Sequence, residues 1–209
     1  MIDLASHWAT TWADRDPSET SWFQETPEPC SSEVRALAPP GARIAAVGVG
    51  ASHLIADLLD RGYGPLEAID ISSTALERLR GSLGAAAARV IIRCEDVRSI
   101  RFDHPVDLWH DRATFHFLVD PDHQRAYVES CALAVRPGGH AVLATFALDG
   151  PSECSGLPIV RYSGDTLAAA FQEDFRLVRS YPHDHRTPWG SVQRFTYAVL
   201  QRLGAPDIA

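Results

Sequence analysis

The sequence predicts an α/β protein built on a doubly wound, mostly parallel sheet of seven strands with an antiparallel last strand. From about residue 43 onward, short apolar runs alternate with segments whose apolar residues recur at helical spacing. This alternation is typical of a parallel sheet covered by helices on both faces. Near the end of the chain, two strand-like runs are separated by too few residues for a crossover helix, which predicts an antiparallel pair.

The first half of the chain gives three strands and two helices. Residues 43–47 form an apolar run that ends in glycines, and residues 52–61 place four leucine or isoleucine side chains on one helical face. Residues 66–71 predict the second strand, and one of Ser72, Ser73 and Thr74 is expected to cap a helix that ends near Gly84. A third strand is expected at residues 90–93.

The second half continues this pattern. We expect a fourth strand at residues 106–110, then a helix that Asp120 or Asp122 caps and that runs through residue 135. The run Arg-Pro-Gly-Gly at residues 136–139 stops that helix, and a fifth strand follows at 140–146. A loop rich in glycine, proline and serine and a short helix near 165–171 then lead to the final strands at 175–181 and 192–201.

Composition and charge exclude several classes of function. The chain has 209 residues, of which 45% are hydrophobic and 22% charged, as in an ordinary globular protein. Nineteen basic residues stand against 27 acidic ones, and a net charge of -8 disfavours binding to nucleic acid or to anionic membranes. Every basic residue is an arginine, which excludes lysine Schiff bases and the phosphate-loop lysine.

The cysteines and the N-terminus indicate the compartment. Four cysteines are widely spaced, and the N-terminal residues lack the basic start and apolar run of a signal peptide. No stretch approaches the ~20 consecutive apolar residues that a membrane-spanning helix needs. We therefore expect a cytoplasmic protein with free thiols and without a membrane segment, and nothing in the sequence sets its oligomeric state.

The first forty residues differ from the rest of the chain. We interpret residues 41–209 as one domain and residues 1–40 as an N-terminal helical and aromatic segment. This segment holds more large aromatic side chains than a solvated tail would, namely Trp8, Trp12, Trp22 and Phe23. Two interpretations stay open: a lid that excludes water from a bound ligand, or a helix that packs against the sheet.

A glycine-rich turn with the sequence GVGAS leaves the first predicted strand at residues 48–52 and enters a helix. Backbone N–H groups in such a turn can face a ligand. Asp70 lies 20 residues beyond Gly50 at the end of the second strand, where a carboxylate can accept both hydroxyls of an adenosine ribose. Asp96, after the third strand, is placed to receive an adenine amino group. A dinucleotide fingerprint needs a third glycine where His53 stands, which disfavours a nicotinamide cofactor.

Taken in this order, residues 40–200 resemble the class I S-adenosylmethionine-dependent methyltransferases, a family with a Rossmann-like sheet. The glycine turn is similar to the glycine-rich loop of the family, Cys94-Glu95-Asp96-Val97 to its adenine contact, and RPGGHAVLATF to its turn into the fifth strand. The resemblance implies S-adenosyl-L-methionine as cofactor and methyl transfer as activity. It assigns cofactor binding to Gly48, Gly50, Ser52, Asp70, Ile71, Asp96, Val97 and Trp12.

One residue departs from the family pattern. The family usually carries an acidic residue two positions before the first glycine of the turn, and this chain has Ala46 there. The departure implies altered contacts at the methionine end of the cofactor. A non-catalytic protein that binds the cofactor is therefore kept as an alternative to an enzyme.

Methyl transfer from a sulfonium is an in-line displacement, which needs alignment, exclusion of water and at most one base. The segment that leaves the fourth strand is where the family places residues facing the methyl group, so we predict that His110 and Asp111 are catalytic. His185 is a further candidate for a base. We also predict that His116, Arg161 and Tyr162 line the acceptor pocket, although a histidine between two phenylalanines also fits the core.

A metal site is not expected. His183 and His185 are two residues apart, a spacing that on a strand puts both on one face. A metal site needs further ligands, and neither a cysteine nor another histidine falls at ligand spacing nearby.

Two looser resemblances concern the methyl acceptor. The tryptophans at positions 8 and 12, WFQ at 22–24, DRA at 111–113 and QRAYV at 124–128 resemble the thiopurine and tellurite-resistance methyltransferases, which implies a thiol or another soft nucleophile. A competing resemblance, to small lysine methyltransferases of translation factors, implies a protein acceptor, and the net charge would suit a lysine-rich one. We predict transfer to a small molecule, with protein lysine methylation as the alternative.

Overall fold

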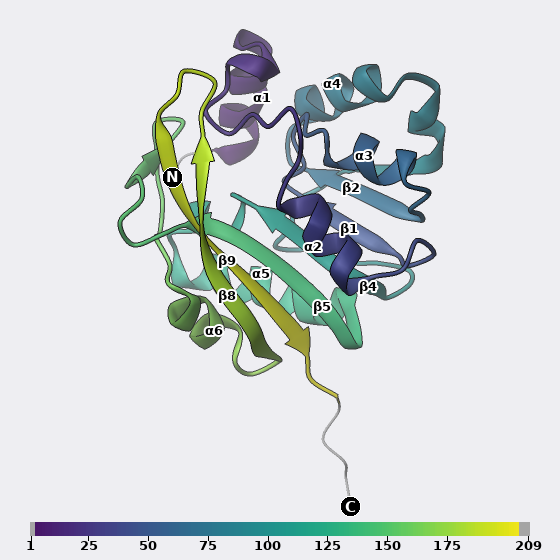
Figure 1. The fold of residues 1–209 in the computed structure, drawn as a ribbon, viewed down its shortest axis with the longest axis vertical. Helices are drawn as coiled ribbons and strands as arrows, with labels where there is room; N and C mark the ends of the chain where they lie inside the picture. Colours follow the sequence, from purple (N-terminus) through teal and green to yellow (C-terminus); the bar gives the residue numbers. More distant parts are fainter. Residues whose placement is uncertain (1–2, 205–209) are drawn as a thin grey trace, which may run out of the picture.

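The core of the protein is a seven-stranded sheet in the order β3-β2-β1-β4-β5-β9-β8 (Figure 1). The structure is a computed structural model that describes residues 3–204. Strand β9 runs antiparallel to both of its neighbours, whereas the other pairs are parallel. The predicted fold is confirmed. The seven strands are β1 (Ile44–Val47), β2 (Leu66–Asp70), β3 (Val90–Cys94), β4 (Val106–Arg112), β5 (Val135–Phe146), β8 (Phe175–Arg186) and β9 (Val192–Arg202).

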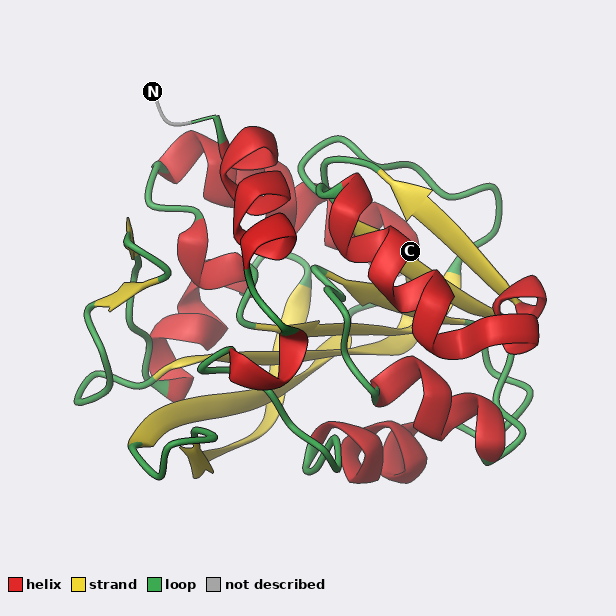
Figure 2. Cartoon of the chain, turned by 90° about the horizontal axis from the view of Figure 1, so that it is seen from above, coloured by secondary structure: helices red, strands yellow, loops and turns green. Residues whose placement is uncertain are grey.

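Helices cover both faces of this sheet, as the view from above shows (Figure 2). One face packs against α2 (Cys30–Leu37), α3 (Leu54–Asp60) and α4 (Ser73–Leu83). The opposite face packs against α5 (Pro121–Ala134) and α6 (Gly164–Phe171). Burial of apolar side chains on both faces explains why the central strands are apolar along their whole length. None of the helices in residues 3–204 has the length and apolar composition that a membrane span requires.

Two helix starts are set by polar side chains. Of the three candidates before α4, Ser72 is the cap, and its hydroxyl accepts a hydrogen bond from the Ala75 amide at 3.3 Å. Asp120, and not Asp122, caps α5, which begins with a proline at its first position. Both capping side chains accept hydrogen bonds from amide groups in the first turn, which have no partner within the helix.

Strand ends differ most from the prediction in β8 and β5, whereas those of the other strands lie within two residues of it. Strand β8 continues to Arg186 and includes Pro182, which pairs with Thr196 of β9. Because β8 is the edge of the sheet, a residue without an N–H group costs no ladder hydrogen bond on its outer side. Strand β5 starts at Val135, directly after α5, and not at residue 140. The loop after β5 also holds two short paired strands, β6 (Glu153–Cys154) and β7 (Leu157–Pro158).

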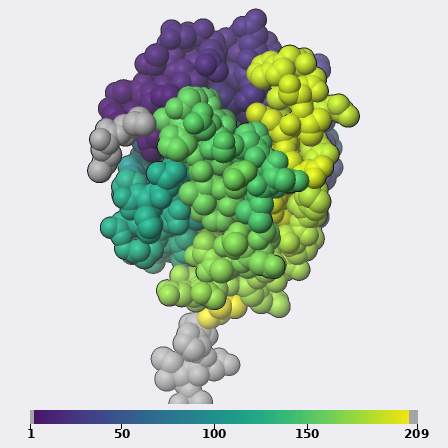
Figure 3. All heavy atoms as spheres, turned by 90° about the vertical axis from the view of Figure 1, so that its left-hand side faces the viewer, coloured from purple at the N-terminus to yellow at the C-terminus, as the bar shows by residue number. Residues whose placement is uncertain are grey.

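The N-terminal segment forms α1 (Leu4–Asp14) and a short 3-10 helix, η1 (Pro17–Glu19), before α2. Figure 3 shows it at the same end of the molecule as the tip of the β8–β9 hairpin. The two parts are joined where His185 Nε2 lies 2.8 Å from the Ser21 carbonyl oxygen. Helix α2 belongs to the core, since Cys30 and Val34 are buried against the sheet.

Candidate active site

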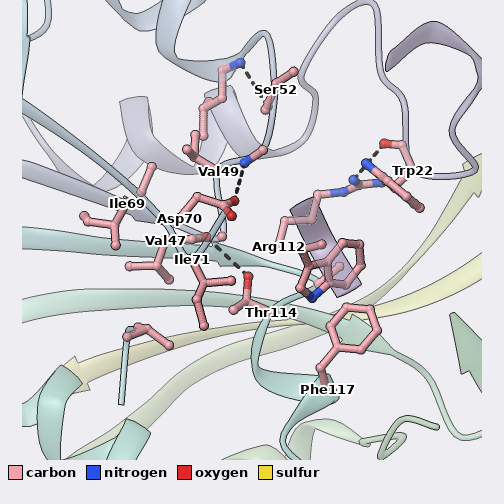
Figure 4. Close-up of a pocket in the computed structure, with 18 of the residues that line it drawn as sticks. Trp22, Val47, Val49, Ser52, Ile69, Asp70, Ile71, Arg112, Thr114 and Phe117 are labelled. Atoms are coloured by element: carbon pink, nitrogen blue, oxygen red, sulfur yellow. Dashed lines mark hydrogen bonds between the residues drawn. The ribbon is translucent and has the colours of Figure 1, made fainter. Parts of the chain in front are cut away.

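A pocket lies at the carboxyl ends of β1, β2 and β4, the edge at which open α/β sheets bind ligands. The glycine turn after β1 and the ends of β2 and β4 form its floor, and the N-terminal segment closes it from above. Figure 4 shows Asp70 and Arg112 on opposite sides of this pocket. All eight residues that we predicted to bind the cofactor line it: Gly48, Gly50, Ser52, Asp70, Ile71, Asp96, Val97 and Trp12.

The turn after β1 requires glycine at two positions. Gly48 and Gly50 have φ values of +56° and +55°, a left-handed conformation that other residues adopt at a cost. A Cβ on Gly48 would lie 1.8 Å from Thr114 Oγ1, and a Cβ on Gly50 would lie 2.6 Å from Trp12 Cζ2. The turn therefore packs tightly between the residues that follow β4 and the N-terminal segment.

Asp70 ends β2 and orders the glycine turn. Its Oδ2 accepts a hydrogen bond from the Gly50 amide at 2.8 Å, and its Oδ1 accepts one from the Ser72 amide at 2.9 Å. Burial raises the pKa of Asp70, and these two amides oppose the shift by stabilising the carboxylate. A carboxylate has about four acceptor positions, so two remain for the hydroxyls of a ligand.

Asp96 is engaged by a neighbour on its own loop. Arg98 Nε lies 3.0 Å from both carboxylate oxygens, and the Arg98 amide donates a further hydrogen bond at 2.9 Å. Burial acts to raise the pKa of Asp96, but the hydrogen bonds from Arg98 outweigh it and lower the pKa overall. An adenine amino group would therefore share this carboxylate with Arg98.

His110 is the one predicted catalytic residue that lines the pocket. It is buried, and its Nε2 has no hydrogen-bond partner among residues 3–204. Burial and the nearby Arg112 guanidinium lower the pKa of His110 to about 4, so the imidazole is neutral at pH 7. Its partner in the parallel register of β1 and β4 is Ala46, the position where the family usually has an acid. The small alanine side chain leaves His110 without a carboxylate on that strand.

Asp111 points to the other face of the sheet, and we no longer assign it a catalytic role. Side chains alternate along a strand, so Asp111 cannot share the pocket with His110. Its carboxylate is fully buried and accepts hydrogen bonds from the Thr114 and Phe115 amides and from the Tyr127 hydroxyl. Burial raises the pKa of Asp111 to about 6. These contacts hold the chain where it leaves β4.

The structure likewise places His116, Arg161, Tyr162 and His185 away from the lining of this pocket. His116 is fully buried, and its Nδ1 accepts a hydrogen bond from the Phe146 amide at 3.3 Å. Tyr162 packs in the core, whereas Arg161 is exposed and donates to the Gly150 carbonyl oxygen. His185 binds the Ser21 carbonyl oxygen, as described above, and so anchors the N-terminal segment. His116 and Tyr162 are buried against aromatic side chains, so both belong to the core.

Sequence reasoning missed Arg112, which lines the pocket beside His110. The alternation of side chains along β4 was the signal that could have found it, because residues 110 and 112 lie on one face. It also missed apolar side chains and thiols that α2 and the segments after β4 bring to the pocket: Cys30, Phe117, Phe146, Cys154 and Phe195. No group of three or more His, Cys, Asp or Glu side chains in the described part of the chain could hold a metal ion.

Comparison with known proteins agrees with this geometry. Residues 44–139 match the family model described as a methyltransferase domain. This stretch runs from β1 to the start of β5 and includes the glycine turn, Asp70, Asp96 and His110. No curated protein matches the chain.

Solved structures share the fold at low sequence identity. A structure from a study of the conversion of a disulfide bond into a thioacetal group during echinomycin biosynthesis has a TM-score of 0.80 and 16% identity, over 99% of this chain and 95% of that one. The N-methyltransferase NodS of Bradyrhizobium japonicum, with S-adenosylhomocysteine, has a TM-score of 0.73 and 13% identity, over 96% and 99%. The 1,6-didemethyltoxoflavin-N1-methyltransferase of Burkholderia thailandensis has a TM-score of 0.69 and 17% identity, over 96% of this chain and 84% of that one.

These likenesses show the fold, and the matched domain carries the glycine turn, Asp70, Asp96 and His110 of the pocket. The sheet order, the glycine turn followed by Asp70 at the end of β2, and the domain match at residues 44–139 agree with one another. Residues 44–139 match a methyltransferase domain, and the chain has the Rossmann-like fold of S-adenosylmethionine-dependent methyltransferases.

Proposed function

We propose that this methyltransferase acts on a small molecule that binds beside His110 and Arg112. The observation that carries the proposal is one continuous pocket, which extends from Asp70 and Asp96 at the ends of β2 and β3 to His110 and Arg112 on β4. Aromatic side chains of the N-terminal segment form its roof, among them Trp12 and Trp22. An enclosed, largely apolar pocket with a few polar groups is typical of small-molecule sites.

The pocket residues fit the cofactor of the family. The close approach of Gly48 and Gly50 to their neighbours leaves backbone, and not side chains, to face a ligand. Asp70 has acceptor positions that would take the two ribose hydroxyls, and Ile71 and Val97, which line the pocket, would supply apolar contacts for the adenine ring. S-adenosylmethionine, when bound, supplies a methyl group on a positively charged sulfur.

The protein then has three tasks in the transfer. The glycine turn and Asp70 orient the adenosine, and the tryptophans of the N-terminal segment exclude water. Neutral His110, with an unpartnered Nε2 in the pocket, can accept the proton of an acceptor hydroxyl, thiol or amine. A soft nucleophile such as a thiol ionises easily and would need this base least.

Two structural relatives support a small acceptor. The toxoflavin-precursor methyltransferase was solved with its small-molecule substrate and S-adenosylhomocysteine, and the echinomycin study concerns a disulfide, which is sulfur chemistry. The resemblance to the thiopurine and tellurite-resistance branch stays a prediction, as do the division at residue 40, the cytoplasmic location and the lysine methylation alternative.

The test is methyl transfer from S-adenosylmethionine carrying a deuterated methyl group. The full chain is incubated with separate panels of thiols, selenols, phenols, amines and lysine-rich peptides, and mass spectrometry measures S-adenosylhomocysteine and the labelled product. We expect a labelled small molecule, and no product with Asp70→Ala. Label on lysine-rich peptides alone would contradict the proposal in favour of a protein acceptor. Cofactor binding without any transfer would favour a non-catalytic protein, in line with Ala46.

A further inference from the structure

Arg112 places a positive charge in the pocket without an acidic partner. Its side chain leaves the end of β4 and lines the pocket next to His110. None of the ion pairs among residues 3–204 includes it. The acids that line the pocket are Asp70, Glu95 and Asp96, at the ends of β2 and β3. The other arginine that lines the pocket, Arg98, pairs with Asp96, so the arginine without an acidic partner lies at the β4 end, with β1 between it and the acids.

Two donors of this guanidinium are free. Nη1 donates to the Trp22 carbonyl oxygen at 2.9 Å (Figure 4), whereas Nε and Nη2 are buried and have no hydrogen-bond partner among the described residues. The N–H groups of Nε and Nη2 lie parallel along one edge of the guanidinium. That edge matches the two oxygens of a carboxylate. A buried charge with unused donors is costly to keep unless a ligand completes it.

The position of the guanidinium separates it from the cofactor end. Its central carbon lies 4.9 Å from the centre of the Phe195 ring on β9, which stands three strands from β1 in the sheet. Strands are about 4.8 Å apart, so β9 lies roughly 14 Å from the strand that leads into the glycine turn. Trp22, Phe117 and Phe146 line this same end.

We propose that the methyl acceptor carries a carboxylate on an aromatic or otherwise apolar body, and that Arg112 binds this carboxylate through Nε and Nη2. The proposal rests on the proposed function and names the substrate class of that site. Arg112 selects the acceptor and holds it beside the unpartnered Nε2 of His110. The aromatic walls would contact the apolar body, and a planar guanidinium serves better than an ammonium for two-point recognition.

The test compares acids with their amides. Protein saturated with S-adenosylhomocysteine is titrated calorimetrically with three pairs: benzoate and benzamide, phenylacetate and phenylacetamide, and indole-3-acetate and indole-3-acetamide. We expect at least one acid to bind ten or more times tighter than its amide. Arg112→Met should remove this preference, whereas Arg112→Lys, which keeps the charge but lacks the paired donors, should retain part of it. The matched control is Arg125→Gln, since Arg125 is an exposed arginine of α5 that pairs with Asp122.

Three results would overturn the proposal. The first is an absence of preference for acids in the wild-type protein, whether both members of each pair bind or neither does. The second is an unchanged preference in Arg112→Met. The third is a tenfold loss of S-adenosylhomocysteine affinity in Arg112→Met with unchanged affinity for 5′-methylthioadenosine, which would assign Arg112 to the carboxylate of the cofactor.

The same titrations separate this proposal from the proposed function. If the wild-type protein binds neither S-adenosylhomocysteine nor S-adenosylmethionine, the proposed function fails. If it binds them and transfers a methyl group, but only to acceptors without a carboxylate, the function stands and the role of Arg112 fails. Arg112→Lys keeps a charge at the position, so it provides a folded comparison should Arg112→Met fold poorly.

Discussion

At the scale of single residues, Asp70 orders the glycine turn and is the residue that we propose to bind the ribose of the cofactor. Its carboxylate accepts the Gly50 and Ser72 amides and retains acceptor positions for the ribose hydroxyls. We expect Asp70→Ala to weaken S-adenosylhomocysteine binding at least a hundredfold, because hydrogen bonds to a charged group contribute about 1.5–3 kcal/mol each. Calorimetry measures the affinity. Asp60→Ala, on the exposed side of α3, is the control, and equal affinities in both variants would remove Asp70 from the ribose site.

His110 gives a second prediction at this scale. If it accepts the proton of the acceptor, His110→Ala should lower kcat more than it raises KM. Because burial and Arg112 lower the pKa of His110 to about 4, wild-type kcat should stay level as the pH falls from 7 to 5 and decline only near pH 4. A decline centred near pH 6.5 would indicate a solvated histidine, and unchanged constants in His110→Ala would leave it a structural role.

The predicted residues that do lie together in the pocket are those whose positions depend on local order along the chain. The glycine turn, Asp70 and Asp96 follow strand ends, so their spacing sufficed to bring them to one pocket. The prediction for Asp111 was wrong because the sequence does not tell which of two successive strand residues, His110 or Asp111, faces the pocket. The predictions that His116 and Tyr162 line the acceptor pocket were wrong because tertiary contacts bury them. His116 packs against Phe146, and Tyr162 packs against Phe115.

At the scale of elements, the N-terminal segment and the glycine turn are in direct contact. A Cβ on Gly50 would meet the Trp12 ring at 2.6 Å, and φ there is +55°. Gly50→Ala should therefore lower the free energy of unfolding by roughly 2–4 kcal/mol, from overpacking and from the left-handed backbone together. In a Trp12→Leu background only the backbone cost of about 1–2 kcal/mol should remain.

Urea denaturation of the two single variants and the double variant measures this coupling. An equal cost of Gly50→Ala in both backgrounds would mean that Trp12 does not cover the turn in solution. A smaller cost of Gly50→Ala in the Trp12→Leu background would support α1 as a lid that rests on the glycine turn.

The sheet could be predicted from sequence more completely than the lid. Each strand carries its own apolar run, and the order of helices between strands favours one topology. The placement of the N-terminal segment instead depends on tertiary contacts, such as those of Ser21 with His185 and of Trp22 with Arg112. Those partners lie about 90 residues or more away along the chain, where no local pattern reveals them.

At the scale of the whole molecule, buried neutral histidines make stability depend on pH. Burial, with a smaller effect of Arg112, lowers the pKa of His116 to about 3, whereas in the unfolded chain it is near 6.5. As the pH falls below 6.5, the unfolded chain takes up protons that the folded protein does not, so the free energy of unfolding falls. The loss amounts to about 2 kcal/mol between pH 7 and pH 5 for this histidine.

The variant His116→Asn isolates that contribution, since its Oδ1 can still accept the Phe146 amide. Urea titrations at pH 7 and pH 5 measure the free energy of unfolding of both proteins. Between these pH values the decrease in His116→Asn should be smaller than the decrease in the wild type by about 2 kcal/mol. Asp111, whose pKa is raised to about 6, acts in the opposite sense but equally in both proteins. Parallel pH dependence in the two proteins would show that His116 is accessible to protons in the folded state.

The measurement that tests the central claim most directly is a calorimetric titration of the full chain with S-adenosylmethionine and S-adenosylhomocysteine, with NADH alongside. The pocket that runs from Asp70 to His110 predicts micromolar binding of both sulfur compounds at one site and no binding of NADH. Binding of NADH, or of none of the three, would contradict the assignment of this pocket to the methyl donor.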